Sequence, residues 1–108
     1  MSAYQRRKGA DAEREIAALV REAFGVDAHR GAQSRSGSDA ADVEGLPDWW
    51  VEVKRGKRPN VRAALAQAIA KTDGRTPVAV IRDDRKDPFV AMTWAAFVEL
   101  AMRAKESK

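Results

Sequence analysis

The sequence contains no cysteine and only one histidine, His29. Without cysteine, the chain has neither a disulfide framework nor a zinc site made of thiolates. A single imidazole also argues against sites that use several histidines as bases or metal ligands. We expect His29 to lie at the surface or at a strand edge, without a catalytic role.

Long apolar runs are absent as well. No stretch approaches the roughly 20 apolar residues that cross a bilayer as a helix, and the first residues lack the apolar segment of a secretion signal. We therefore expect an intracellular, cytoplasmic protein.

The composition is that of one ordinary globular domain covering residues 1–108. Hydrophobic residues make up 44% of the chain and charged residues 33%. The net charge of +4 and the pI near 9.8 favour a polyanionic partner only mildly. The distribution is more informative, because the basic residues gather in short groups: Arg6-Arg7-Lys8, Arg30 with Arg35, and Lys54-Arg55 with Lys57-Arg58.

Hydrophobic periodicity predicts an α/β fold with three helices on a mixed sheet. Helical spacing covers residues 9–24, a segment from Asn60 to Gly74, and a segment from the N-cap Thr93 to about Arg103. Strands are expected at 26–30, 41–44, 49–55, 77–82 and 89–92, and the 77–82 strand is apolar on both faces, as a central strand should be. Residues 1–8 are expected to be a basic tail, either solvated or an arm on phosphates.

Asp42, Glu52 and Lys54 are the strongest candidates for a chemical site. Side chains alternate along a strand, so Glu52 and Lys54 share one face, with Cα atoms roughly 7 Å apart. A turn predicted at residues 45–48 folds Asp42 back beside Glu52. Two carboxylates can hold a hard cation such as Mg²⁺, which supplies a nucleophilic water and neutralises phosphate charge, and a lysine adds a fixed charge. The pattern favours metal-dependent phosphodiester cleavage.

Three neighbouring carboxylates are weaker candidates. Asp48 lies four residues from Glu52, roughly 13 Å along a strand and too far to share an ion. Asp39 lies nearer the Ser/Gly-rich loop than Asp42 does. Glu44 is two residues from Asp42 and can share its face, so it stays a minor candidate.

Glu13 lies at the margin of the apolar stripe of the first helix. At about 100° per residue it is roughly 55° from the centre of that stripe, whereas Glu15 is roughly 105° away. A carboxylate at such a margin needs a partner. A metal site at the boundary of helix and sheet is one such partner, and a surface salt bridge to an arginine or lysine is the other.

Two adjacent tryptophans lie on opposite faces of the 49–55 strand. Trp49 is expected in the core. Trp50 shares the face of Glu52, where we expect partial burial at an interface, with stacking on a nucleic-acid base as the alternative.

Glu13, "GSDAADVEG" and "WWVEVKR", in this order and on this scaffold, resemble the PD-(D/E)XK nuclease superfamily, whose restriction-endonuclease-like fold has an αβββαβ core. More closely, the chain is similar to archaeal-type Holliday junction resolvases and their phage-borne relatives. The matching segments cover nearly the whole chain: "RRKGADAERE", Arg30, "RSGS", "DV" at 42–43 and "VEVK" at 51–54. One departure is Ala41, which stands where the family motif has proline.

The resemblance implies a role for each matching residue. Asp42, Glu52 and the backbone carbonyl of Val53 would bind the metal, and Lys54 would orient or activate the attacking water. Glu13 would complete the site through the metal or its waters, while Ser36 would lie near the scissile phosphate and Gln67 matches a family glutamine. Residues expected to contact DNA are Arg6, Arg7, Lys8, Arg30, Arg35, Ser36, Arg55, Lys57 and Arg58.

The resemblance therefore implies a Mg²⁺-dependent DNA endonuclease, with Mn²⁺ as a second suitable metal. A four-way junction needs two symmetric incisions, so a homodimer with two-fold symmetry is expected, although no heptad or apolar patch in the sequence marks an interface. A nicking or repair endonuclease on other DNA, and a non-catalytic DNA-binding module with the same fold, remain the alternatives.

Overall fold

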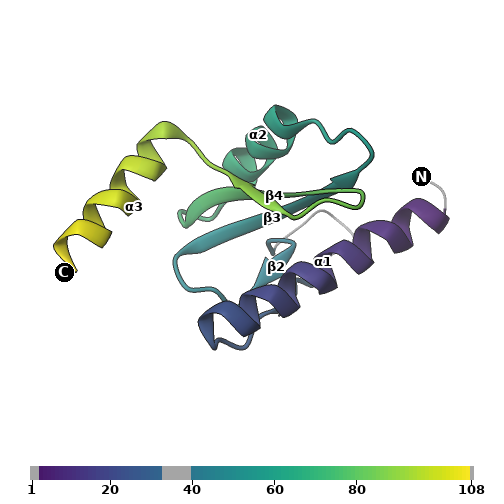
Figure 1. Cartoon of the computed structure of the whole chain (residues 1–108), viewed down its shortest axis with the longest axis horizontal. Helices are drawn as coiled ribbons and strands as arrows, with labels where there is room; N and C mark the ends of the chain where they lie inside the picture. Colours follow the sequence, from purple (N-terminus) through teal and green to yellow (C-terminus); the bar gives the residue numbers. More distant parts are fainter. Residues whose placement is uncertain (1–2, 33–39, 108) are drawn as a thin grey trace.

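The computed structural model describes residues 3–32 and 40–107, and its elements follow the predicted order of helices and strands (Figure 1). The α/β class is confirmed. The elements are α1 (Ala3–Phe24), β1 (His29–Arg30), β2 (Val43–Glu44), β3 (Trp49–Gly56), α2 (Val61–Lys71), β4 (Thr76–Asp83), β5 (Phe89–Ala91) and α3 (Trp94–Glu106).

The five strands form one mixed sheet in the order β1-β2-β3-β4-β5. β3 and β4 run parallel, from Trp49 opposite Thr76 to Gly56 opposite Asp83, and α2 makes the crossover between them. The other neighbouring strands pair antiparallel. As predicted, β4 is a central strand, and Val78, Ala79, Val80 and Ile81 are all buried.

Two helices cover the two faces of this sheet, with α1 below it and α2 above it in Figure 1. Under α1, Ile16 and Ala17 pack with Val43, Val51 and further apolar residues of β4. On the α2 side, Trp50 packs with Ala41 and Ala68, while Ala64 packs with Ala79 and Ile81. The strand period of two therefore sends Val51 to α1 and its neighbours Trp50 and Glu52 to the α2 side.

The turn between β2 and β3 brings the two candidate carboxylates together. Gly45 has φ 106°, and a Cβ at this position would lie 2.4 Å from the backbone oxygen of Asp27, so glycine is required for both conformation and space. Asp48 also adopts a positive φ, of 71°, and it is exposed at the end of the turn. The chain then reverses so that Val43 pairs with Val51.

The first helix is longer than its sequence pattern indicated. It begins at Ala3 rather than near residue 9, so the basic residues of the expected tail lie on its first two turns. The Nζ atom of Lys8 lies 2.9 Å from Oδ2 of Asp84 in the loop after β4. This ion pair joins the N-terminal part of α1 to the far end of the sheet.

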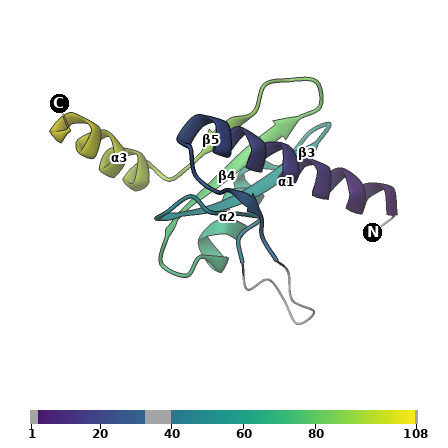
Figure 2. The same cartoon turned by 90° about the horizontal axis from the view of Figure 1, so that it is seen from below.

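The last helix, α3, differs from α1 and α2 in its burial. Thr93 is its N-cap, as predicted, since Oγ1 of Thr93 accepts a hydrogen bond of 3.0 Å from the amide of Ala96. Yet α3 contributes no buried residue, and it projects away from the sheet in both views (Figures 1 and 2).

Candidate active site

Asp42 and Glu52 come together at the point where the β2–β3 ladder ends. Asp42 is the residue just before β2, and its Oδ2 accepts a hydrogen bond of 2.9 Å from the backbone amide of Val53. Its carboxyl group also lies within hydrogen-bond distance of the carboxyl group of Glu52. The sequence prediction that a turn would place these two carboxylates side by side is confirmed.

Glu52 is the buried member of this pair. Its exposed fraction is 4%, and burial raises its pKa to about 7, with the hydrogen bond and the negative charge of Asp42 acting in the same direction. The indole of Trp50, which donates a hydrogen bond of 2.9 Å to Oε1, and the charge of Lys71 lower the pKa but do not cancel the burial effect. Two carboxylates so close together hold one proton between them or need a cation.

The donor set fits a hard divalent cation. Two carboxylates and the neighbouring carbonyl of Val53 offer oxygen ligands of the kind that Mg²⁺ takes, together with waters and substrate phosphate. In the described residues, no group of three or more His, Cys, Asp or Glu side chains converges on one point. The side chains here would thus supply two carboxylate ligands. The backbone carbonyl of Val53, waters and substrate phosphate would fill the other coordination positions of the cation.

Glu13 approaches the pair from α1. Its Oε1 lies 2.6 Å from Nε of Arg30, so the salt bridge expected as one alternative is present. Burial raises the pKa of Glu13, and the charge of Asp42 raises it further, against the lowering effect of Arg30. Asp42 therefore acts electrostatically on both Glu13 of α1 and Glu52 of β3.

Lys54 shares the strand and the face of Glu52 but differs from it in burial. Lys54 is exposed, and it forms no ion pair within residues 3–32 and 40–107. It is therefore available to a ligand from solvent.

A groove runs between the first turns of α1 and the C-terminal half of β3. Among the residues that the structure describes, its charged lining consists of six cations and one carboxylate: Arg6, Lys8, Arg30, Lys54, Arg55, Lys57 and Glu13. Tyr4, Gly9, Ala10, Val53 and Gly56 complete it. Asp42 and Glu52 do not line the groove, but Val53, whose amide binds Asp42, does. The carboxylate pair is therefore joined to a strongly basic surface through Val53.

Some of the residues expected to contact DNA have ion-pair partners inside the protein, and others are exposed. Lys8 and Arg55 both face Asp84, at 2.9 Å and 3.6 Å, and Arg30 is held by Glu13, so these three cations have partners inside the protein. Lys57 and Arg58 are exposed and form no ion pair with a described residue. Arg7 lines a second, adjoining hollow with Lys8, Arg55 and Arg85. The expected contact residues Arg35 and Ser36, and the rival ligand Asp39, lie outside the described residues.

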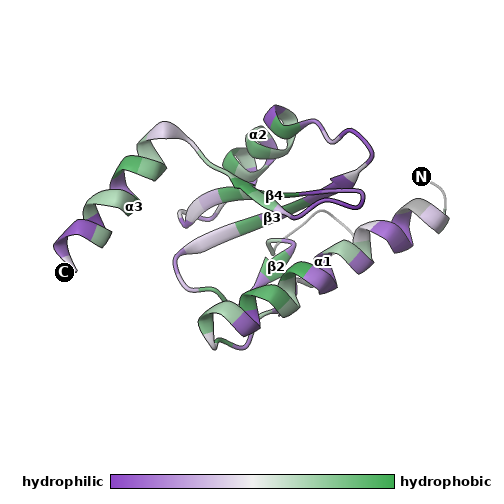
Figure 3. Ribbon diagram, in the orientation of Figure 1, coloured by the Kyte–Doolittle hydropathy of each residue, from purple (hydrophilic) through white to green (hydrophobic). Residues whose placement is uncertain are grey.

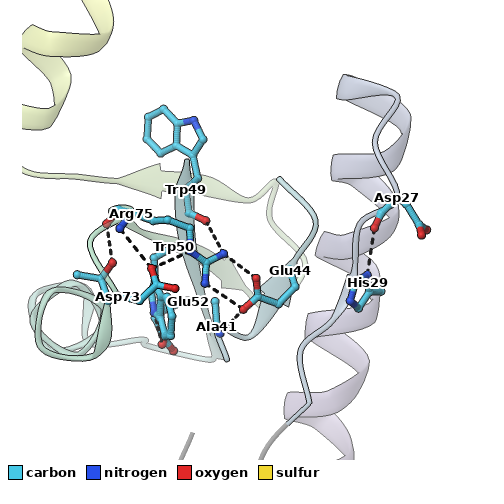
Figure 4. A network of polar contacts seen from close by, with 10 residues as sticks. Asp27, His29, Ala41, Glu44, Trp49, Trp50, Glu52, Asp73 and Arg75 are labelled. Carbon is cyan, nitrogen blue, oxygen red and sulfur yellow. Dashed lines mark hydrogen bonds and ion pairs between the residues drawn. The ribbon is translucent and has the colours of Figure 1, made fainter. Parts of the chain in front are cut away.

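A polar network connects Glu52 with Trp50, Arg75, Glu44 and Ala41 (Figure 4). The guanidinium of Arg75 binds Glu44 at 2.6 and 3.2 Å, and its carbon lies 4.9 Å from the centre of the Trp50 ring. Glu44 in turn accepts a hydrogen bond of 2.8 Å from the amide of Ala41, next to Asp42. Arg75 therefore fixes both the residue beside Asp42 and the indole that binds Glu52.

The structure corrects two sequence expectations. Trp50 is 1% exposed, so it is fully and not partly buried and cannot stack on a base. Trp49 packs against the main core, as expected, and is partly buried there. Glu44 is engaged by Arg75, which lowers the pKa of Glu44 by a hydrogen bond, so it is not an available metal ligand.

The remaining residues singled out in the sequence lie at the surface. His29 is exposed on β1, where its Nδ1 lies 3.0 Å from the carbonyl oxygen of Asp27. Gln67 is exposed on α2. Glu15 is partly buried and pairs with Arg82 at 2.9 Å.

Sequence reasoning missed Arg75, Lys71 and the supporting role of Trp50. Arg75 follows Gly74 in a turn and joins a glutamate 31 residues earlier, so no local pattern marks it. The spacing of Trp50 and Glu52 at i and i+2 on one strand face was the available signal for the indole–carboxylate bond.

Comparison with protein-family models, with curated proteins and with solved structures gave no match. Among the described residues, no helix has the length and apolar character needed to traverse a bilayer.

Proposed function

We propose that this chain is a Mg²⁺-dependent DNA endonuclease with the PD-(D/E)XK nuclease core, acting on branched DNA inside the cell. One observation carries the proposal. A buried glutamate, Glu52, shares a hydrogen bond with Asp42, and Asp42 is bonded to Val53, which lines a groove with six cations among the described residues. A protein that only bound phosphate would have no use for a buried pair of carboxylates, because they repel the ligand.

The proposed metal ligands are Asp42, Glu52 and the carbonyl of Val53. When bound there, Mg²⁺ would supply an activated water and neutralise charge on the scissile phosphate. Lys54, which is exposed and has no ion-pair partner among the described residues, would hold a non-bridging phosphate oxygen or the attacking water. Glu13 would accept a hydrogen bond from a water near Asp42, while Arg30, Lys57 and Arg58 bind the DNA backbone.

A cleavage assay on supercoiled plasmid tests the activity. We expect nicking and linearisation with Mg²⁺, none with EDTA, and none from the Asp42→Asn or Glu52→Gln variants, which keep the shape of each side chain. Glu22→Gln, an exposed change on α1, is the matched control and should cut like the wild type. If either carboxylate variant cuts at the wild-type rate, the site assignment is wrong.

A competition experiment tests the substrate. A labelled four-way junction should be bound and cut with paired incisions in opposing strands, and unlabelled linear duplex of equal length should compete poorly. Equal competition by the duplex would favour a nicking or repair endonuclease. Binding of both DNAs without any metal-dependent cleavage would favour a non-catalytic module.

A further inference from the structure

Asp84, in the loop between β4 and β5, faces two cations of the basic surface. Its Oδ2 lies 2.9 Å from Nζ of Lys8 on α1, and its Oδ1 lies 3.6 Å from Nε of Arg55 on β3. All three residues line the hollow, of about 550 Å³, that adjoins the groove. Figure 3 shows that the loop and the nearby turns of α1 are both hydrophilic. Asp84 therefore occupies two cations that would otherwise be open to an anion from solvent.

The contact between Asp84 and Arg55 is incomplete. At 3.6 Å it is longer than a hydrogen bond, and in the described part of the chain neither Nε of Arg55 nor Oδ1 of Asp84 has a hydrogen-bond partner, although both atoms are buried. Buried polar atoms are normally paired. A phosphate group has more acceptor oxygens than a carboxylate and bonds well to a guanidinium group. The hollow therefore suits a phosphate better than it suits Asp84.

Two further cations in this hollow have no internal partner. Arg7 and Arg85 are exposed and form no ion pair with a described residue. Among the described residues the lining carries four cations against two carboxylates, Asp84 and Asp11, and Asp11 pairs with Arg14 at 3.0 Å. The hollow therefore keeps a positive charge that attracts anions even with Asp84 in place.

The loop that carries Asp84 and Arg85 is held in a strained conformation. Arg85 has a φ of 63°, in the left-handed region that a residue with a side chain seldom adopts. The guanidinium of Arg82 donates a hydrogen bond of 2.6 Å to the carbonyl of Asp83, and the amide of Asp84 donates one of 3.1 Å to the carbonyl of Gly56. Backbone strain that is maintained by surrounding bonds is typical of binding sites.

We propose that this hollow binds a backbone phosphate of DNA, and that the phosphate enters by displacing Asp84 from Lys8 and Arg55. The inference rests on the proposed function and adds to it a carboxylate that competes with the substrate, together with Arg85 as a phosphate ligand. A single small anion must replace a bond that is already made. A polyanion places other phosphates in the groove at the same time, so its binding there offsets the displacement. Asp84 therefore favours DNA over free phosphate.

Asp84→Asn tests the displacement, and Asp87→Asn is its matched control. Both variants remove one negative charge from the same loop, but Asp87 is exposed and forms no ion pair with a described residue. Binding of a four-way junction is measured without Mg²⁺. We expect Asp84→Asn to bind about tenfold more tightly at low salt, with a log–log salt dependence steeper by about one. Asp87→Asn should stay within about twofold of the wild type, because an exposed charge is screened by salt.

Arg85→Gly should separate binding from stability. Glycine adopts a positive φ without strain, so the melting temperature should be equal to that of the wild type or higher. Loss of the cation should weaken binding of the junction by about threefold or more. Lys86→Gln, which removes an exposed charge next to Arg85 but outside the hollow, is the control. An equal loss of affinity in both variants would exclude Arg85 as a phosphate ligand.

Thermal unfolding with inorganic phosphate, against chloride at equal ionic strength, tests the site without DNA. Phosphate should raise the melting temperature of Asp84→Asn and leave that of Asp87→Asn unchanged. If Asp84 only joins α1 to the sheet, Asp84→Asn will melt lower, will not respond to phosphate and will bind DNA no better than Asp87→Asn, and the proposal is wrong. Tighter junction binding by Asp84→Asn, in a protein that cuts no DNA, would support this site and reject the endonuclease. A wild type that does not bind DNA would overturn both proposals.

Discussion

The indole nitrogen of Trp50 lies 2.9 Å from Oε1 of Glu52, two residues along the same strand. The bond is buried, and the ring that makes it is covered by the guanidinium of Arg75 at 4.9 Å. An interaction of this kind orients a metal ligand without touching the substrate.

Replacement of Trp50 by phenylalanine should therefore impair cleavage while preserving most of the packing. Loss of such a supporting bond typically lowers metal affinity or activity by about 10- to 100-fold. We expect the Mg²⁺ concentration for half-maximal cleavage to rise, and excess Mg²⁺ to restore part of the rate. Trp49→Phe, on the opposite face of β3, is the control. An unchanged Mg²⁺ requirement in Trp50→Phe would show that the indole only fills space.

The metal-free protein should lose stability as the pH rises through 7. The pKa of Glu52 is raised to about 7 in the folded state against an ordinary 4.5, so the folded state holds its proton more tightly than the unfolded chain. The stabilising contribution is fully present below about pH 4.5 and is lost above about pH 7, a difference of about 3 kcal/mol. The raised pKa of Glu13 acts with the same sign.

Thermal unfolding of Glu52→Gln at several pH values checks this relationship. The amide stays neutral, so the variant should melt at a higher temperature than the wild type at pH 8 and at a similar temperature near pH 4.5. Mg²⁺ should stabilise the wild type at pH 8 and leave the variant unchanged. A variant that is less stable than the wild type at pH 8 would contradict the proposed strain between the carboxylates.

Glu13→Gln and Glu15→Gln are a matched pair on α1 with different expected outcomes. Both glutamates form an ion pair with an arginine, but the charge of Asp42 acts on Glu13, whereas Glu15 binds Arg82. We expect Glu13→Gln to lower the cleavage rate at least tenfold. Glu15→Gln should change only stability, by up to about 1 kcal/mol. Equal cleavage rates in the two variants would reduce Glu13 to a salt-bridge residue.

Lys54→Ala should abolish cleavage without affecting the fold, because the side chain is exposed and has no ion-pair partner in the described residues. Lys54→Arg should fail to restore it, since a broad planar guanidinium does not replace a compact ammonium. Lys57→Ala, in the same groove, should weaken DNA binding and reduce its dependence on salt while cleavage persists. Normal turnover by the arginine variant would remove Lys54 from the chemistry.

Local sequence patterns were sufficient for the order of the elements and for the Asp42–Glu52 pair, because alternation on one strand and a turn between two strands are short-range features. They did not give the start of α1 or the short lengths of β1 and β2. Local patterns could not predict which side chains on a strand face would be buried. Trp50 and Lys54 lie on the same strand face, yet one is enclosed under α2 and the other is exposed, and the position of a helix folded over from later in the chain decides which. The role of Arg75 likewise follows from its contact with Glu44, 31 residues earlier in the chain.

Asp42 divides its carboxylate between two tasks. Because β2 begins only at Val43, Oδ2 of Asp42 takes the place of a strand carbonyl and satisfies the amide of Val53, leaving the rest of the group to Glu52 and to any cation between them. Replacement of Asp42 by alanine would thus remove the hydrogen bond to the Val53 amide and the proposed metal ligand together. Loss of activity in that variant could then result from either change. Asparagine keeps an acceptor for that amide, so it alone can separate the architecture of this corner from its chemistry.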